Sequence, residues 1–154
     1  MLASLLDFAN LMLAALVAGT LFGVWLFLNP RGLDAMSYAT LQQQAIRTMN
    51  TVMPPLGAAT IVATVGAAFL EREDHVRFWL RIAAALCFAA AGLITRLKNQ
   101  PINAVVMTWR RYLPPSNWTI LRDAWWQWHV FRLATGICGI SLLFAAMLKC
   151  SANV

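Results

Sequence analysis

Six residues toward the C-terminal end of the chain recur at alternating spacings of four and three, which places them on one face of a helix. They combine two guanidinium groups, an imidazole and two indoles, and are Trp118, Arg122, Trp125, His129, Arg132 and Gly136. In a membrane helix, polar side chains that face the interior of a bundle are candidates for function. We call this set the polar stripe and interpret it as one wall of an internal site.

The side chains of the polar stripe suit a reaction in which the substrate supplies the electrons. A phenol or enol that has lost its proton can react with dioxygen, so the protein needs a base, donors that stabilise the anion, and an aromatic pocket. The expected catalytic residues are His129 as the base and Arg122 and Arg132 as the cations. The expected substrate-binding residues are Asn99, Asn103, Trp109, Trp118 and Trp125. On this hypothesis, replacing either arginine by alanine abolishes activity, whereas His129→Asn retains part of it.

Metal chemistry has little support in the sequence. The second histidine, His75, lies in a charged turn on the opposite side of the membrane, and no Glu or Cys stands near His129. A haem or a zinc centre needs more ligands than one side of the membrane supplies. The three cysteines include no Cys-Xaa-Xaa-Cys pair, which disfavours thiol redox chemistry. We therefore expect no metal and no other cofactor, and we expect Asp123 to form a surface ion pair with Arg122.

Two structural explanations compete with a functional site. Tryptophans and arginines gather at membrane interfaces, so the residues that lie off the stripe are expected to be interfacial anchors. These residues are Trp126, Trp128, Arg110 and Arg111. The stripe itself could instead form a polar network that holds its helix against the preceding one.

The composition indicates an integral membrane protein. Of the 154 residues, 60% are hydrophobic and 12% are charged, against roughly 45–50% and about 25% in soluble domains. The net charge of +6 is expected to meet anionic lipid headgroups rather than nucleic acid. Apolar runs predict membrane spans at about 7–28, 52–70, 77–97 and 130–149. The predicted fold is one all-α domain, 1–154: an integral membrane four-helix bundle with a long fourth helix and a polar, aromatic cap.

Local signals predict how the first three helices are connected. Pro30 ends the first helix, and the short charged turn at 71–77 makes the second and third helices an antiparallel hairpin. Residues 31–49 are expected to form an interfacial helix or the start of the second helix. Pro54 and Pro55 then mark either a kink or the true start of that helix.

The last part of the chain is expected to contain one break and one long helix. The run 99–103 carries a proline between asparagines and is expected to end the third helix. Pro114-Pro115 followed by Ser116 or Asn117 is a helix-start signal. The fourth helix is therefore expected to run without interruption from about 118 to 149, with its first turns beyond the hydrocarbon core.

The order of motifs in the second half of the chain resembles that of a known family. The motifs are Asn99-Gln-Pro-Ile-Asn103, Trp109, Pro114-Pro115, Trp118, Leu121-Arg122, Trp125, His129 and Arg132. They resemble the anthrone-oxygenase-like family of small four-helix integral membrane proteins, formerly a domain of unknown function. The resemblance is specific over 99–132, and the order of spans extends it over 7–149. It implies oxidation of anthrones to anthraquinones without a recognised cofactor.

The expected function is that of a membrane oxygenase or redox enzyme that acts on a hydrophobic aromatic compound, anthrone-like or hydroquinone-like, without a metal or flavin. The alternative is a non-catalytic membrane subunit or a lipid- or quinone-binding protein. A haem or metal protein is a third hypothesis, which the scarcity of histidine disfavours. The expected partners are a hydrophobic small molecule and the lipid bilayer, not nucleic acid, with a homo-oligomer or a membrane complex left open. The expected location is the bacterial inner membrane.

Overall fold

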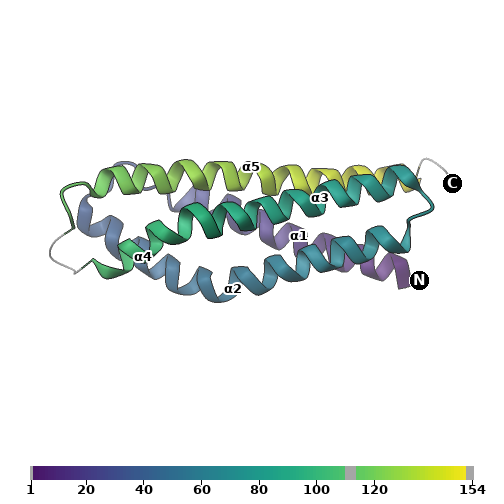
Figure 1. Ribbon diagram of the computed structural model, residues 1–154, viewed down its shortest axis with the longest axis horizontal. Helices are drawn as coiled ribbons and strands as arrows, with labels where there is room; N and C mark the ends of the chain where they lie inside the picture. Colours follow the sequence, from purple (N-terminus) through teal and green to yellow (C-terminus); the bar gives the residue numbers. More distant parts are fainter. Residues whose placement is uncertain (1, 110–113, 152–154) are drawn as a thin grey trace.

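Four long helical rods lie side by side in the computed structural model, which describes residues 2–109 and 114–151 (Figure 1). Three rods are single helices: α1 (Leu2–Phe27), α2 (Ala35–Leu70) and α5 (Trp118–Ser151). The third rod along the chain consists of three consecutive segments: α3 (His75–Ile94), the π-helical turn η1 (Thr95–Asn99) and α4 (Gln100–Thr108). All four rods are long and apolar enough to cross a membrane. The expected all-α bundle is confirmed, and α1 begins at the end of the bundle where α5 ends.

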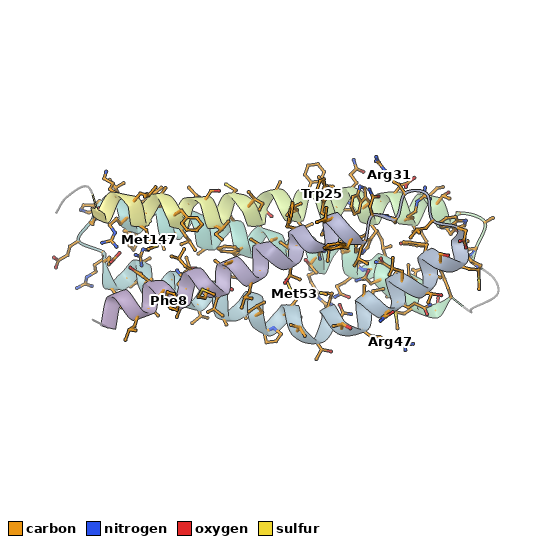
Figure 2. All side chains as sticks on the ribbon, turned by 180° about the vertical axis from the view of Figure 1, so that it is seen from behind. Phe8, Trp25, Arg31, Arg47, Met53 and Met147 are labelled. Atoms are coloured by element: carbon orange, nitrogen blue, oxygen red, sulfur yellow. The ribbon has the colours of Figure 1, made fainter. Side chains whose placement is uncertain are left out.

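The outer surface of the bundle is apolar, as a lipid environment requires. Large hydrophobic side chains project outward from each rod (Figure 2). Examples are Phe8 on α1, Val62 on α2, Leu86 on α3 and Leu148 on α5. The chain is therefore an integral membrane protein.

The helix α2 is continuous although Pro54 and Pro55 lie inside it. The expectation that residues 31–49 include the start of this helix is confirmed, and a true start near Pro55 is wrong. Proline lacks the N–H that would bond the carbonyl one turn earlier, and its ring crowds that carbonyl. Figure 2 accordingly shows α2 bending beside Met53.

Asp34 fixes the first turn of α2. Its carboxylate accepts a hydrogen bond from the Ser37 hydroxyl at 2.6 Å, and from the backbone N–H groups of Ser37 and Met36 at 3.1 and 2.9 Å. These bonds, that of the hydroxyl above all, hold the pKa of Asp34 below its ordinary value of 3.8. The cap therefore stabilises the fold above that ordinary value and loses its contribution as the pH falls through the lower, folded-state pKa.

The third rod is not broken at 99–103, so that expectation is wrong. The helix continues through η1, where the backbone N–H of Gln100 bonds the carbonyl of Thr95, five residues earlier. The wider turn places Pro101 at the start of α4, where a missing N–H removes no bond that the helix needs. Turns of this kind occur often at functional sites.

The other two connections agree with the expectations. The turn between α2 and α3 occupies 71–74, so these helices form the predicted antiparallel hairpin. The helix α5 begins at Trp118, directly after the predicted start signal, and its first backbone N–H bonds the carbonyl of Pro115 at 3.0 Å. It then runs to Ser151 without interruption.

Close contact between α5 and α3 at Gly139 gives the first testable prediction. A Cβ at this position would lie 3.0 to 3.2 Å from three atoms of the Phe88 ring, which is held in the core with Ala84 and Leu143. We expect Gly139→Ala to lower the free energy of unfolding by about 1–3 kcal/mol, because overpacking outweighs the better helix propensity of alanine. Gly66→Ala is the matched control, since a Cβ there meets nothing within 4 Å. Unfolding midpoints in detergent micelles check the prediction, and equal midpoints for the two variants contradict it.

Four charged side chains form a network at the end of the bundle where α1 begins. Arg81 is buried and contacts Asp7 and Glu71, each at 2.7 Å, and Arg77 contacts Glu71 at 2.6 Å. The network joins α1 and α3 to the residue that follows α2. The sequence places Glu71 and Arg77 in a charged turn, but it gives no sign that Asp7 and Arg81 join them.

Candidate functional site

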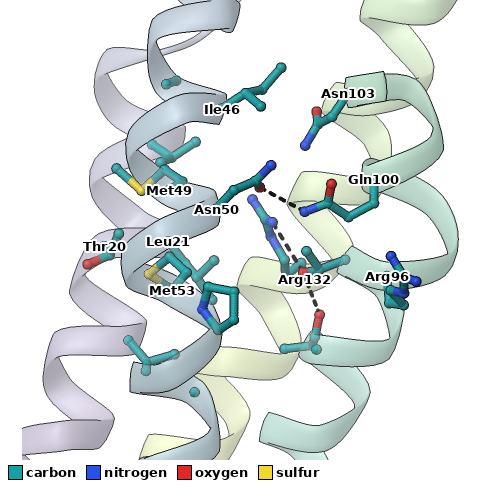
Figure 3. A pocket seen from close by; sticks show the side chains of 18 of the residues that line it. Thr20, Leu21, Ile46, Met49, Asn50, Met53, Arg96, Gln100, Asn103 and Arg132 are labelled. Atoms are coloured by element: carbon teal, nitrogen blue, oxygen red, sulfur yellow. Dashed lines mark hydrogen bonds between the residues drawn. The ribbon is translucent and has the colours of Figure 1, made fainter. Parts of the chain in front are cut away.

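A cavity of about 460 Å³ lies around η1, with walls from all four rods (Figure 3). Much of its wall is apolar and includes Val17, Leu21, Val24, Ile46, Met53, Ile61 and Phe88. Polar side chains gather in another part of the wall, and they are Gln42, Asn50, Gln100 and Asn103. Ligand pockets in proteins typically have volumes of roughly 300–1,000 Å³ and mainly apolar walls with a few polar groups. The cavity therefore has the size and the lining of a site for a hydrophobic molecule with a polar edge.

Two irregular helical segments border the cavity. Pro54 in α2 and Thr95, the first residue of η1, both line it. The prolines bend α2, and the π-helical turn widens the third rod. Both distortions disturb the regular packing of straight helices at the same level of the bundle, and the cavity lies there.

The cavity reaches the outer surface between α2 and η1. Asn50, Pro54 and Arg96 line the cavity and are also exposed. At this opening the Gln100 side-chain N–H donates to Asn50 Oδ1 at 2.7 Å, which links α4 to α2 (Figure 3). The opening lies on the side of the bundle, between α2 and η1, rather than at its end.

Arg132 brings a positive charge to the cavity wall (Figure 3). Its Nη1 donates to Thr95 Oγ1 at 3.2 Å, and its Nη2 contacts His129 Nδ1 at 2.7 Å. Within 2–109 and 114–151, no carboxylate lies within 4.0 Å of the guanidinium, and its Nε is buried without a hydrogen-bond partner. A cation removed from water without a counter-ion is unfavourable, so this wall favours an anionic group.

His129 is fully buried behind Arg132, between two indoles. Its ring stacks on Trp125, with the ring centroids 5.4 Å apart and the planes 8° from parallel, and lies 5.6 Å from the ring of Trp126. Its Nε2 has no hydrogen-bond partner in the part of the chain that the structure describes. His129 contacts Arg132 but is not part of the cavity lining, and its role as a base stays a prediction.

Asn99 and Asn103 face the polar stripe, as their spacing predicts. Asn99 is fully buried, and its Nδ2 donates to the backbone carbonyl of Trp125 at 3.1 Å. Asn103 Oδ1 accepts from Trp125 Nε1 at 2.9 Å and from Gln42 Nε2 at 3.5 Å. Of these residues, Gln42, Asn103 and Trp125 line the cavity, whereas Asn99 fixes the backbone of α5.

The N-terminal part of the polar stripe, Trp118 and Arg122, lies in an aromatic cap that also contains Tyr38 and Trp109. Trp118 and Trp109 pack against the buried Tyr38, with ring centroids 5.8 and 5.9 Å from it. The Arg122 guanidinium lies 5.0 Å from the centre of the Trp118 ring and forms the predicted ion pair with Asp123 at 2.9 Å.

The expectation that Trp118, Arg122, Trp125, His129 and Arg132 line one cavity with Asn99 and Asn103 is met only in part. Asn103, Trp125 and Arg132 line it, whereas Trp118, Arg122 and His129 do not. From Trp118 to Gly136 the stripe extends about 27 Å along the helix. Spacing specifies the face of the helix on which residues lie but not which of them reach a given cavity along the helix axis. One stripe therefore contributes residues to both the cap and the cavity.

The off-stripe residues differ from one another. Trp126 was expected to be an interfacial anchor, but it is buried against His129, Val24 and Trp125, because α1 covers the neighbouring face of α5. Trp128 does not line the cavity, and its ring lies 4.9 Å from Lys98 Nζ. Arg110 and Arg111 lie outside the described residues.

Several lining residues carried no recognisable signal in the sequence. Gln42 and Asn50 on α2, Thr95 in η1 and Gln100 on α4 come from separate segments with no shared spacing. In the sequence Gln42 is one of three consecutive glutamines, and nothing in that run marks it as a lining residue. Across the described ranges, no three His, Cys, Asp or Glu side chains gather closely enough to hold a metal ion.

Comparison with known proteins identifies the family. The anthrone oxygenase family model matches residues 43–142, which include η1, α4 and most of α5. No curated protein and no solved structure matches the chain. The matched segment is well over half of the chain and carries Asn103, Trp125 and Arg132. The chain belongs to the anthrone oxygenase family.

Proposed function

We propose that the protein is a membrane oxygenase that oxidises a hydrophobic aromatic compound of the anthrone or hydroquinone type inside the cavity. The observation that supports this proposal best is the Arg132 guanidinium at the cavity wall with no carboxylate within 4.0 Å among the described residues. A substrate that forms an enolate or phenolate supplies the missing negative charge. The apolar walls from Val17, Ile61 and Phe88 suit fused rings.

The proposed reaction of an anthrone balances with dioxygen alone. The ring methylene loses a proton, and the resulting enolate oxygen lies against Arg132, which favours the anion. Electrons pass from the anion to dioxygen, a carbon–oxygen bond forms, and a proton completes a hydroperoxide. Loss of water then turns this carbon into the second carbonyl of the anthraquinone. One oxygen atom ends in the quinone and the other in water.

The first proton needs an acceptor. His129 was predicted for this role, but its Nδ1 contacts Arg132 and its side chain is not part of the cavity lining. Water at the polar part of the wall, beside Gln42, Asn103 and Gln100, is the acceptor that we propose. The cation contributes by lowering the pKa of the substrate, so that a weak base suffices.

A second candidate function is the binding of a lipid or quinone by a non-catalytic membrane subunit. The exposed Arg96 at the opening supports it, because a guanidinium beside an apolar cavity also suits an anionic headgroup with its chains inside. Both candidates have a hydrophobic small molecule and the bilayer as partners. For both we propose the bacterial inner membrane as the location.

Oxygen uptake distinguishes the two candidates. The protein in lipid nanodiscs is mixed with 1,8-dihydroxyanthrone, and oxygen consumption is compared with that in nanodiscs without protein, because anthrones also oxidise slowly without catalysis. We expect protein-dependent uptake and, with ¹⁸O-labelled dioxygen, one labelled oxygen in the quinone product. Binding of the anthrone without excess uptake contradicts the oxygenase and favours the binding subunit.

A further inference from the structure

We propose that His129 is a positioning residue that acts through Arg132, with Nδ1 as the acceptor that holds the guanidinium at the cavity wall. This assignment differs from the predicted role as a base. Its consequence for turnover rests on the proposed oxygenase function, whereas the protonation of the ring can be tested without any substrate.

The chemistry of the contact fixes which ring nitrogen carries the proton. A guanidinium has five N–H donors and no acceptor. At 2.7 Å from Nη2, the His129 Nδ1 must therefore be the acceptor, with its lone pair directed at Arg132. A neutral imidazole with an acceptor at Nδ1 carries its hydrogen on Nε2. The lone pair that a base would use is already engaged.

The surroundings hold the ring in this orientation. His129 is fully buried. The ring of Trp125 lies nearly parallel to the imidazole, and the ring of Trp126 lies 5.6 Å from it. Trp125 is itself fixed by its hydrogen bond to Asn103 and by the bond from Asn99 to its backbone carbonyl. Rotation of the imidazole would disturb this packing.

Thr95 is the second acceptor for Arg132 and is oriented in a similar way. Its hydroxyl donates to the carbonyl of Ala91 at 2.9 Å, which leaves the oxygen lone pairs free to accept from Arg132 Nη1 at 3.2 Å. Both partners of the guanidinium are therefore neutral. A carboxylate in either place would offset the charge, whereas two neutral acceptors orient the cation and leave its charge available to an anion in the cavity.

Nuclear magnetic resonance of ¹⁵N-labelled histidine tests the assignment directly. The chain has two histidines, so His75→Gln leaves His129 as the only signal. At neutral pH we expect an unprotonated Nδ1 and a protonated Nε2, with the Nδ1 signal shifting in the Arg132→Gln variant. A hydrogen on Nδ1, or an Nδ1 signal that does not respond to Arg132→Gln, overturns the proposal whether or not the protein is an oxygenase.

Substitutions at position 129 test the consequence for turnover. Asparagine places its Oδ1 on Cγ, as histidine does its Nδ1, so His129→Asn can still accept from Arg132. We expect this variant to lose less than about tenfold in the rate of anthrone-dependent oxygen uptake, whereas His129→Leu loses on the order of 10²-fold because the cation is no longer held. Equal losses in the two variants indicate a base and contradict positioning.

Two substitutions of Thr95 provide an independent test if His129→Leu does not fold. Thr95→Ser keeps the acceptor and is expected to retain the rate within a few-fold, whereas the isosteric Thr95→Val removes it and is expected to lower the rate at least about tenfold. Equal rates for these two variants contradict the view that neutral acceptors position Arg132.

Discussion

Replacing Arg132 by glutamine is expected to lower the rate of anthrone-dependent oxygen uptake by about 10²- to 10³-fold, the usual effect of removing one stabilising donor from a site sheltered from water. Glutamine keeps an N–H donor but has no charge, so the enolate forms less readily. The Michaelis constant should change less than the rate, because the neutral substrate gains little from the cation and the anion gains much.

Two further variants sharpen this test. Arg132→Lys keeps the charge but cannot reach both Thr95 and His129 with a planar fork, so we expect an intermediate rate. Arg47→Gln is the matched control, since Arg47 is exposed on α2 and does not line the cavity. If Arg132→Gln is folded and turns over at the wild-type rate, the anion does not form at this wall and the oxygenase mechanism is wrong.

The variant Arg122→Ala tests whether the aromatic cap contributes to turnover as the cavity does. The sequence alone predicts that loss of either arginine abolishes activity. In the structure Arg122 pairs with Asp123 and stacks near Trp118, outside the cavity lining, so we expect a smaller loss than for Arg132→Gln. An equally large loss would place the cap in the catalytic machinery.

The features that could be predicted from the sequence are those that depend on short-range patterns. Uncharged runs indicate the rods, the proline pair before Ser116 marks the start of α5, and a spacing of four places Asn99 and Asn103 on the face that meets Trp125. Each of these depends only on the period of a helix and on the residues that begin or end it.

The remaining features depend on how the rods pack. The level at which the cavity lies is set by the bend at Pro54 and the π-helical turn beginning at Thr95, and a proline in the sequence marks either a helix start or a bend until its neighbours are known. Gln42 lies 61 residues from its hydrogen-bond partner Asn103. No local pattern connects two such amides, so their contact could not be predicted from the sequence without the fold.

The largest expected effect on stability concerns the charged network at the other end of the bundle. Arg81→Met is expected to lower the free energy of unfolding by about 3–5 kcal/mol, because breaking a buried ion pair leaves a charge without its partner. The Arg81 side chain is only 3% exposed and contacts Asp7 Oδ1 and Glu71 Oε2, each at 2.7 Å. In its absence two carboxylates share Arg77, whose contact to Asp7 is 3.7 Å.

The control for Arg81→Met is Arg72→Met, which removes an exposed arginine from the turn between α2 and α3 and is expected to change stability by less than about 0.5 kcal/mol. Unfolding by a denaturing detergent in mixed micelles measures both variants. A cycle with Asp7→Asn should show a coupling of about 0.5–3 kcal/mol, because the two side chains are in contact. Oxygen uptake per folded molecule should stay unchanged, since the network does not border the cavity. If Arg81→Met is no less stable than Arg72→Met, the ion pairs do not hold α1 to α3, and apolar packing around Ala14, Val17 and Ala84 must do so instead.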